Sequence, residues 1–405
     1  MSLDRLAVDG GSPVRDRMLP LGRPWITERE IQAAADAVRA GLLMGNGPLG
    51  RKAEEALEQV LGTPALFMTS CTAALEAAVR LCGVRPGDEV ICPSFTFVSS
   101  ANAILCGGGR PIFADIDRRT LNVDPAAIEA AIGPRTRAIM VVHYGGRACA
   151  MDRVLEIAAR HSLPVIEDAA HGLGARWQGR PLGTIGEFGC VSFHSTKDVV
   201  CGEGGALVCR RPEDRRRAEI LREKGTNRAE FLRGEVDKYT WISEGSSYVA
   251  SDVLAAILTA QLERLPLFIE RKRHLATRLT ELLQPVAHLA ELPGEWPGIE
   301  SNWHLYPVLV APALRDRVLA ALRAEGIGAA FHYVPLHSSP FGRECLGHHA
   351  SDLPVTEEVS ASLVRLPLFA AMTDADLEDV GTATVKVLGR LVRQDSGFRN
   401  QDSGA

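Results

Sequence analysis

The sequence predicts an α/β fold, in which a mostly parallel sheet is covered by helices on both faces. Seven short apolar runs have the length of buried strands, and helical stretches lie between several of them. Continuous apolar strands that alternate with helices are typical of parallel sheets buried on both sides. The length of 405 residues, 46% of them hydrophobic, predicts about two domains or one large domain with an appendage.

The first elements are an arm and two helices. Residues 1–25 have no regular pattern, so we expect an irregular arm there. A helix is expected over 27–40, because Thr27 can cap its start and Gly41 can stop it. Its apolar residues share one face: Ile31, Ala34, Ala35 and Val38. A glycine-rich turn and a second helix near 51–61 follow.

The middle of the chain alternates between strands and helices. The seven predicted strands are 65–68, 89–92, 111–114, 138–143, 164–167, 189–193 and 206–209. The predicted helices between them are 72–81, 98–106, 125–132 and 151–160. In a sheet of this kind, ligands bind at the carboxyl ends of the strands.

The composition changes after about residue 211. We expect a charged helix over 211–223, a long polar loop over 224–247, and a helical region over 251–283 that Pro266 interrupts. A second α+β unit covers about 290–390. The expected organisation is an arm (1–25), a large domain (26–265), a smaller C-terminal domain (266–392) and a polar, disordered tail (393–405).

Several classes of function are not expected from this composition. The net charge of −5 shows no large basic block, so nucleic acid is not an expected partner. No apolar run is long enough to span a membrane, and the first residues lack a secretory signal, so we expect a cytoplasmic protein. The nine cysteines form no C-x-x-C pair. We expect them to be reduced, and we expect no metal site.

Two polar clusters follow neighbouring predicted strands. Asp168 ends one strand, and Lys197 lies in the turn beyond the next, before a Gly-Glu-Gly-Gly loop (202–205). Taken alone, Asp168 could be a helix N-cap and Lys197 a solvated charge. Together, a strand-end acid and a lysine among small residues suit pyridoxal phosphate, with a carboxylate at the ring nitrogen and a lysine that forms a Schiff base.

Two further clusters also follow strands. Cys71, Thr72 and Ala73 begin a helix after a Thr-Ser pair, and free amides at a helix N-terminus can hold a phosphate. Ser and Thr caps are common, so this signal alone is weak. Phe97 follows the next strand and could stack on a flat cofactor, although an isolated Phe is more often part of the core.

The combination resembles the DegT/DnrJ/StrS-type nucleotide-sugar aminotransferases over about residues 20–390. The matching segments are Pro-Ser-Phe-Thr-Phe (93–97), Glu-Asp-Ala-Ala-His (167–171), Ser-Phe-His-x-x-Lys (192–197), Gly-Glu-Gly-Gly (202–205) and Phe-His-Tyr-x-Pro-Leu-His (331–337). The resemblance implies the fold type I of pyridoxal phosphate enzymes, similar to aspartate aminotransferase. Segments 222–228, 236–241 and 245–248 most resemble the family's transaminases that make dTDP-4-amino-4,6-dideoxygalactose.

The resemblance implies a role for each matched residue. Lys197 would bond to the cofactor and move the proton, and Asp168 would keep the pyridine nitrogen protonated. Phe97 would stack on the ring, and His171 would lie near its phenolic oxygen. The phosphate would be held by four residues: Cys71, Thr72, Ala73 and Ser192. Cys71 stands where most relatives have Gly, so it should contribute only its amide.

The family builds each site from two subunits, which implies a homodimer with shared active sites. Ser247 stands where relatives carry an Asn that reaches the phosphate in the neighbouring subunit, and Asp198 replaces the Asn that often follows the lysine. Expected substrate contacts are Arg228, Lys238 and Tyr239 on the polar loop, and His332 and His337 in the C-terminal unit. Surface or core positions are an equally good interpretation of these five.

The reaction implied is the transfer of an amino group from L-glutamate to C4 of a dTDP-4-keto-6-deoxyhexose. The alternatives are a transaminase acting at C3 or on another nucleotide sugar, and a non-catalytic regulator that binds pyridoxal phosphate. A dehydratase of the same fold would carry His in place of Lys197. A nicotinamide oxidoreductase would need a G-x-G-x-x-G motif opening a helix, and Gly107–Gly109 instead precedes a strand.

Overall fold

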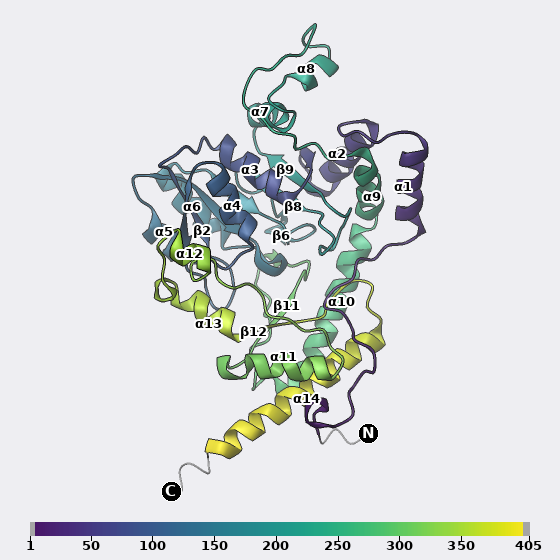
Figure 1. The fold of residues 1–405 in the computed structure, drawn as a ribbon, viewed down its shortest axis with the longest axis vertical. Coiled ribbons are helices and arrows are strands. Elements are labelled where there is room, and N and C mark those ends of the chain that lie inside the picture. The colour runs from purple at the N-terminus through teal and green to yellow at the C-terminus, as the bar shows by residue number, and fades with distance from the viewer. Residues whose placement is uncertain (1–4, 400–405) are drawn as a thin grey trace.

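The computed structural model describes residues 5–399, and its centre is a seven-stranded sheet (Figure 1). The strand order is β1-β9-β8-β5-β4-β2-β3. The strands are β1 (Ala65–Met68), β2 (Glu89–Pro93), β3 (Arg110–Ala114), β4 (Thr136–Val142), β5 (Val165–Asp168), β8 (Phe188–Ser192) and β9 (Gly205–Cys209). Only β9 runs antiparallel to its neighbours. The mostly parallel sheet predicted from the sequence is therefore confirmed, and all seven predicted runs contribute to it.

Alternation along the strands divides the core into two layers. Leu66, Val90, Met140 and Ile166 point to one face, where they pack against helices α3 (Cys71–Leu81), α4 (Val98–Cys106) and α7 (Pro212–Arg222). The intervening residues face the other side. There they pack against four helices: α2 (Pro48–Leu61), α5 (Pro125–Ala131), α6 (Met151–His161) and α9 (Asp252–Leu262). Both faces are buried, as the continuous apolar strands predict.

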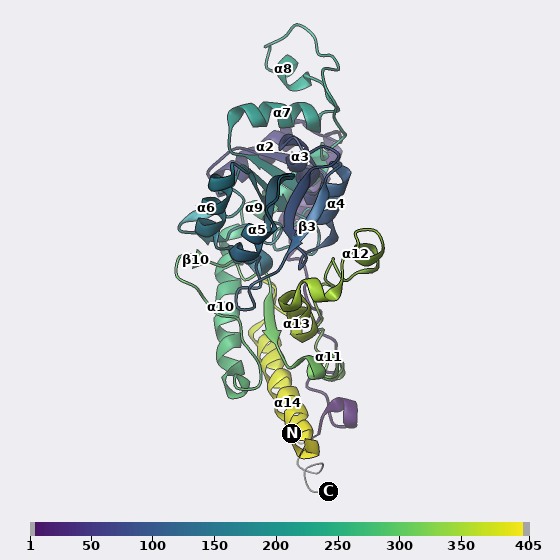
Figure 2. The ribbon, with the colours of Figure 1, turned by 90° about the vertical axis from the view of Figure 1, so that its left-hand side faces the viewer.

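The C-terminal unit packs below the sheet in Figures 1 and 2 around its own core. It contains a two-stranded antiparallel sheet of β11 (Tyr306–Leu309) and β12 (Leu363–Leu366). Its helices are α10 (Leu265–Leu283), α11 (Arg315–Ala324), α12 (Pro340–Glu344), α13 (Pro354–Ser362) and α14 (Asp374–Arg399). Pro266 lies in the first turn of α10, where a missing N–H costs little. The break between α9 and α10 therefore falls at the expected interruption.

The N-terminal arm joins the two units. Leu6 and Leu19 are buried in the core of the C-terminal unit. The carbonyl of Trp25 accepts hydrogen bonds from Gln261 (3.1 Å) and Arg264 (3.1 Å), close to the junction of α9 and α10. The segment leading into α1 (Glu28–Arg39) is thereby fixed against both units.

Helix α1 begins at the expected cap but presents its apolar side to the outside. Thr27 and Glu30 form a capping box. Ile31 and Val38 are each 55% exposed, whereas the buried positions of α1 are Glu30 and Ala37. Burial of Glu30 costs less than usual because it pairs with Arg264 at 2.8 Å. The apolar face noted in the sequence therefore lies on the surface of this chain.

Three parts of the chain differ from the sequence-based expectation. The loop after α7 contains a short helix, α8 (Arg228–Leu232), and projects from the large domain in both views (Figures 1 and 2). Small strands β6 (Arg176–Trp177), β7 (Arg180–Pro181) and β10 (Ile299–Glu300) form a third sheet that the sequence did not predict. Helix α14 continues to Arg399, where disorder was expected from 393, because extending a formed helix costs little. Residues 400–405 of that expected tail, and 1–4 of the arm, lie outside the described residues.

Candidate functional site

The carboxyl ends of β1, β2, β5 and β8 surround a cavity of about 410 Å³. Asp168 is the last residue of β5 and Ser192 the last of β8, while Lys197 lies in the turn beyond Ser192. The lining includes most of the residues expected at the cofactor: Cys71, Thr72, Phe97, Asp168, His171, Ser192 and Lys197. Residues more than a hundred positions apart in the chain, such as Cys71 and Lys197, therefore line the same cavity at this edge of the sheet.

The start of α3 forms one end of this cavity. Ser70 caps the helix, and its Oγ accepts the N–H of Ala73 at 3.0 Å. The Ala73 amide is therefore engaged within the chain, which leaves the first amides, of Cys71 and Thr72, pointing from the helix N-terminus. The Thr72 hydroxyl lies 2.8 Å from that of Ser99. A Cβ on Gly205 would come within 2.3 Å of the Cys71 nitrogen, so only glycine fits behind this end.

Asp168 also lines the cavity, and within residues 5–399 its carboxylate accepts two hydrogen bonds. Ser100 Oγ donates to its Oδ2 at 2.8 Å, and the Ala170 N–H donates to its Oδ1 at 3.1 Å. Burial raises the pKa of Asp168, although Ser100, Ala170 and the charge of Lys197 act in the other direction. A protonated ring nitrogen would supply the charged donor that this carboxylate lacks, so Asp168 fits the pyridine end of the cofactor.

Lys197 and two rings complete the cavity. Burial lowers the pKa of the Lys197 amine, which favours the neutral form needed by a nucleophile or base. Phe97 is 56% exposed although it lines the cavity, so a ring face is available to a flat ligand. Burial also lowers the pKa of His171, whose Nδ1 accepts the N–H of Gly145 at 3.3 Å. The proton of this neutral imidazole therefore lies on Nε2.

A second cavity, of about 420 Å³, meets the first at Lys197 and His171. It lies between the large domain, the arm and the C-terminal unit, with contributions from Arg23, Trp25, His304, His332 and Arg365. The rings of His304 and His171 stack with centroids 4.3 Å apart. The amine of Lys197 can thus be reached by a group in either cavity.

Of the expected substrate contacts and Ser247, only His332 lines either of these two cavities. His337 is fully buried elsewhere, with its Nδ1 2.7 Å from Ser94 Oγ. Arg228 pairs with Glu223 at 3.1 Å, and Lys238 and Tyr239 are exposed on the projecting segment. Ser247 is exposed at the base of that segment. Only His332 lines the second cavity, where its Nδ1 lies 2.6 Å from the Tyr144 hydroxyl.

Comparison with known proteins agrees with this geometry. Residues 24–385 match the DegT/DnrJ/EryC1/StrS aminotransferase family. The chain belongs to this family. Its members share pyridoxal phosphate as cofactor, so the chain is an aminotransferase that uses this group.

The relatives of this DegT/DnrJ/EryC1/StrS aminotransferase match it over almost their full lengths. The spore coat polysaccharide biosynthesis protein SpsC of Bacillus subtilis is 35% identical, over 90% of this chain and 96% of that protein. The aminotransferase TlmJ of Streptoalloteichus hindustanus is 32% identical with a TM-score of 0.86, over 92% of this chain and 100% of that one. DesV of S. venezuelae is 31% identical with a TM-score of 0.81, over 90% and 95% of the two chains. These similarities confirm the expected fold type I.

Sequence analysis missed several groups around the lysine of this aminotransferase. Ser100 is the donor to Asp168, and no motif marks it. Lys272 is fully buried and pairs with Asp198, whose other oxygen lies 3.0 Å from His304 Nδ1. One signal was present: Lys272 is one of only six lysines, and the residues three and four positions from it, which share its side of a helix, are apolar: Phe268, Ile269, Leu275 and Ala276. Nothing in the sequence alone pairs it with Asp198.

Proposed function

We propose that this enzyme is a nucleotide-sugar aminotransferase that moves the amino group of L-glutamate to C4 of a dTDP-4-keto-6-deoxyhexose. The products would be 2-oxoglutarate and a dTDP-4-amino-4,6-dideoxyhexose. The observation that carries the proposal is the half-buried Lys197, which lines both cavities where they meet, with Asp168 in the lining of the first. Sugar substrates are supported by structural neighbours such as a putative sugar aminotransferase of Streptococcus pneumoniae in its PMP form, 25% identical with a TM-score of 0.87. That match covers 94% of this chain and 100% of that one.

The residues of the first cavity would hold the cofactor. The amides of Cys71 and Thr72, with the hydroxyls of Thr72 and Ser192, form the phosphate end, and Asp168 binds the ring nitrogen. Phe97 contacts the ring face. When bound, the group supplies an electron sink for the carbon that gains or loses the amino group. Burial lowers the pKa of the Lys197 amine, which favours a neutral base, and this amine would move a proton between that carbon and C4′ of the cofactor.

The proposal includes a homodimer with shared active sites. The outer side of α1 and its following turn carry exposed apolar residues: Ile31, Val38, Leu43 and Met44. The projecting segment carries Phe231, Tyr239 and Trp241, and Trp241 is 77% exposed. Large exposed apolar surfaces of this kind mark interfaces. In the dimer, the site of each subunit would be reached by four residues of the other: Arg228, Lys238, Tyr239 and Ser247. Sedimentation velocity should show a species of twice the chain mass.

The test is a visible absorbance spectrum of the protein loaded with pyridoxal phosphate. Addition of L-glutamate should remove the band of the lysine-bound cofactor, and dTDP-4-keto-6-deoxyglucose should restore it. Restoration by a 3-keto sugar or another nucleotide sugar instead would move the reaction to the alternative substrates. A bound cofactor that ignores every amino donor would indicate a regulator and contradict the proposal.

A further inference from the structure

Arg365 projects from β12 of the C-terminal unit into the second cavity, which it shares with Lys197. Its Nε donates to the carbonyl of Phe331 at 3.2 Å. Within residues 5–399, no carboxylate lies within ion-pair distance of its guanidinium. Burial lowers the pKa of Arg365, while Tyr144 and Tyr333 favour its charge. This cation is therefore partly removed from water without an anion to balance it.

Arg365 is half-buried, and the fully buried cations of residues 5–399 show how unusual its lack of an anion is. Arg264 pairs with Glu30 at 2.8 Å, Arg222 pairs with Glu54, and Lys386 pairs with Glu325 at 2.8 Å. Arg147 has no such pair but lies over the rings of Trp296 and Trp303, at 5.1 and 5.8 Å. A buried charge is costly unless it is paired. Lys272 is also buried and pairs with Asp198. Arg365 differs from these five because its unpaired charge faces a cavity that Lys197 also lines.

The surroundings of Arg365 leave the second cavity with excess positive charge. Burial lowers the pKa of His304 to about 4 and also lowers that of His332, so both imidazoles are neutral near pH 7. Asp198, the acid in the lining, is already paired with Lys272 and His304. Arg23 lies at the mouth, with its guanidinium 6.0 Å from the Phe369 ring. A ligand with one or two negative charges would balance Arg365 and Arg23.

We propose that Arg365 binds a carboxylate of the amino donor, L-glutamate, and that Arg23 at the mouth attracts the second carboxylate. This inference rests on the proposed function. In an amino acid the carboxylate is bonded directly to the carbon that carries the amino group. A carboxylate on Arg365 therefore places that carbon near Lys197, in the cavity that both residues line. In a nucleotide sugar, by contrast, the diphosphate is attached to C1, across the ring from C4. Arg is suited to a carboxylate because its two N–H groups form parallel hydrogen bonds.

The test is calorimetric titration of the protein loaded with pyridoxal phosphate, using glutarate as an unreactive dicarboxylate and dTDP as a second probe. Arg365→Gln should weaken glutarate binding by about ten- to a hundred-fold, the effect of losing a charged hydrogen-bonded pair. The glutarate affinity of Arg365→Lys should lie between that of the wild type and that of Arg365→Gln, because lysine keeps the charge but cannot form two parallel hydrogen bonds. Arg271→Gln is the matched control. It removes an arginine that pairs with Asp374 at 2.8 Å and does not line the cavity.

Kinetics provide a second readout. Arg365→Gln should raise KM for L-glutamate and leave KM for the keto sugar near the wild-type value. Unchanged glutarate binding in Arg365→Gln, or an equal loss in Arg271→Gln, would overturn the inference. Weaker dTDP binding with normal glutarate binding would assign Arg365 to the nucleotide diphosphate and would also overturn it. A wild-type spectrum that ignores both L-glutamate and keto sugar would refute the proposed function, while the glutarate titration would still decide whether Arg365 holds a carboxylate.

Discussion

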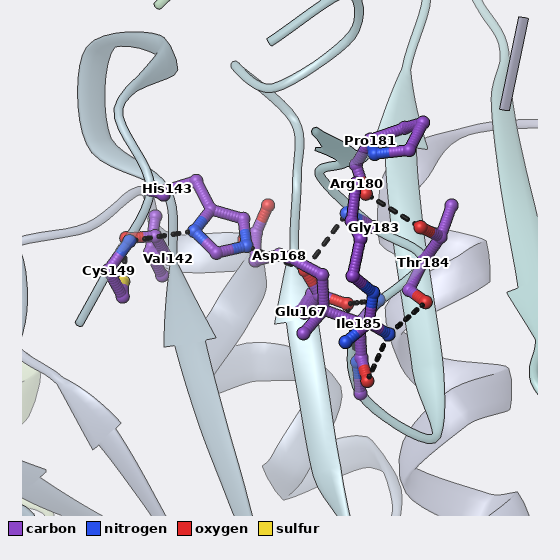
Figure 3. Close-up of polar contacts among 12 residues, drawn as sticks. Val142, His143, Cys149, Glu167, Asp168, Arg180, Pro181, Gly183, Thr184 and Ile185 are labelled. Carbon is purple, nitrogen blue, oxygen red and sulfur yellow. Dashed lines mark hydrogen bonds and ion pairs between the residues drawn. The ribbon is translucent and has the colours of Figure 1, made fainter. Parts of the chain in front are cut away.

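Two adjacent acids at the end of β5 have opposite surroundings. Glu167 accepts from the N–H groups of Gly183 (2.9 Å), Ile185 (2.6 Å) and Gly186 (2.7 Å), and its Oε2 lies 2.8 Å from His143 Nε2. Figure 3 shows this carboxylate between the histidine and the loop. Burial opposes its charge, but these donors outweigh the cost and lower the pKa of Glu167. Among residues 5–399 the carboxylate of Asp168 has two donors, and its pKa is raised.

The difference indicates that Glu167 is a structural acid, whereas Asp168 faces a cavity that a ligand can occupy. Strand alternation turns Glu167 towards the face where β5 and the 183–186 loop pack together, and it turns Asp168 towards the cavity. His143 Nδ1 accepts the Cys149 N–H at 3.2 Å, so its remaining proton is donated to Glu167. Both carboxylate oxygens of Glu167 thus accept from donors within the chain, whereas the proposed charged donor to Asp168 is the ring nitrogen of the cofactor.

The largest effect is expected at Lys197, whose side chain lines the same cavity as Asp168. Lys197→Ala removes the group that bonds to the cofactor and carries the proton. Loss of a general base alone costs about 10²- to 10⁴-fold in rate, and loss of the covalent step adds to it. We expect no detectable steady turnover of L-glutamate with keto sugar in a coupled assay. Sustained turnover by this variant would refute the role of Lys197.

Asp168→Asn separates function from stability. Removing the charge at the ring nitrogen should lower kcat by about 10²- to 10³-fold, the range seen when a preorganised electrostatic partner is lost. The melting temperature without cofactor should stay near the wild-type value, because burial disfavours this charge and no ion pair within residues 5–399 includes Asp168. The two measurements are steady-state kinetics and thermal unfolding of cofactor-free protein. A variant with normal kcat would contradict the assignment.

Glu167→Gln is the matched change on the other face. An amide would place its own N–H donors against the backbone donors of Gly183, Ile185 or Gly186. Breaking a buried charged network of this kind costs about 3–5 kcal/mol. We expect a clear fall in melting temperature, with kcat less affected than in Asp168→Asn. An unchanged melting temperature would show that the saturated contacts of Glu167 do not stabilise the fold.

Asp198, like Glu167, is an acid whose partners lie within the chain, and the pH dependence of stability tests whether such pairing stabilises the fold. Burial opposes its charge, but Lys272 and His304 lower its pKa from 3.8 to about 2. Because the folded-state pKa is the lower one, the stabilisation is present above about pH 4 and is lost as the pH falls towards 2. Melting temperature should therefore drop across this window. In Asp198→Asn this part of the drop should vanish, and the protein should be less stable at pH 7 because Lys272 is left buried and unpaired.

The smallest effect is expected at Cys71. Its side chain is 9% exposed and burial raises its pKa, so it is a neutral thiol. If only the Cys71 amide holds the phosphate, Cys71→Ser should change the affinity for pyridoxal phosphate by only a few-fold, about 1 kcal/mol or less. Fluorescence titration of the cofactor measures this. A loss of a hundred-fold would show that the thiol itself takes part.

The sequence predicted those parts that depend on local pattern. Apolar runs located the strands, and the rule that ligands lie at strand ends placed Asp168, Ser192 and Lys197 together. The second cavity could not be predicted in this way. Arg365 and His304 reach it from the C-terminal unit, and their positions depend on how two domains pack. The outward face of α1 was missed for a related reason, because an apolar stripe does not reveal whether its partner is the same chain or another.

The central claim is that Lys197, beside Asp168, is the lysine that bonds to pyridoxal phosphate. The chain has six lysines, at 52, 197, 224, 238, 272 and 386, so the site of attachment can be determined directly. The loaded protein would be reduced with borohydride, digested and mapped by mass spectrometry. We expect the pyridoxyl group on Lys197 alone. Its presence on another lysine, or on none, would contradict the account.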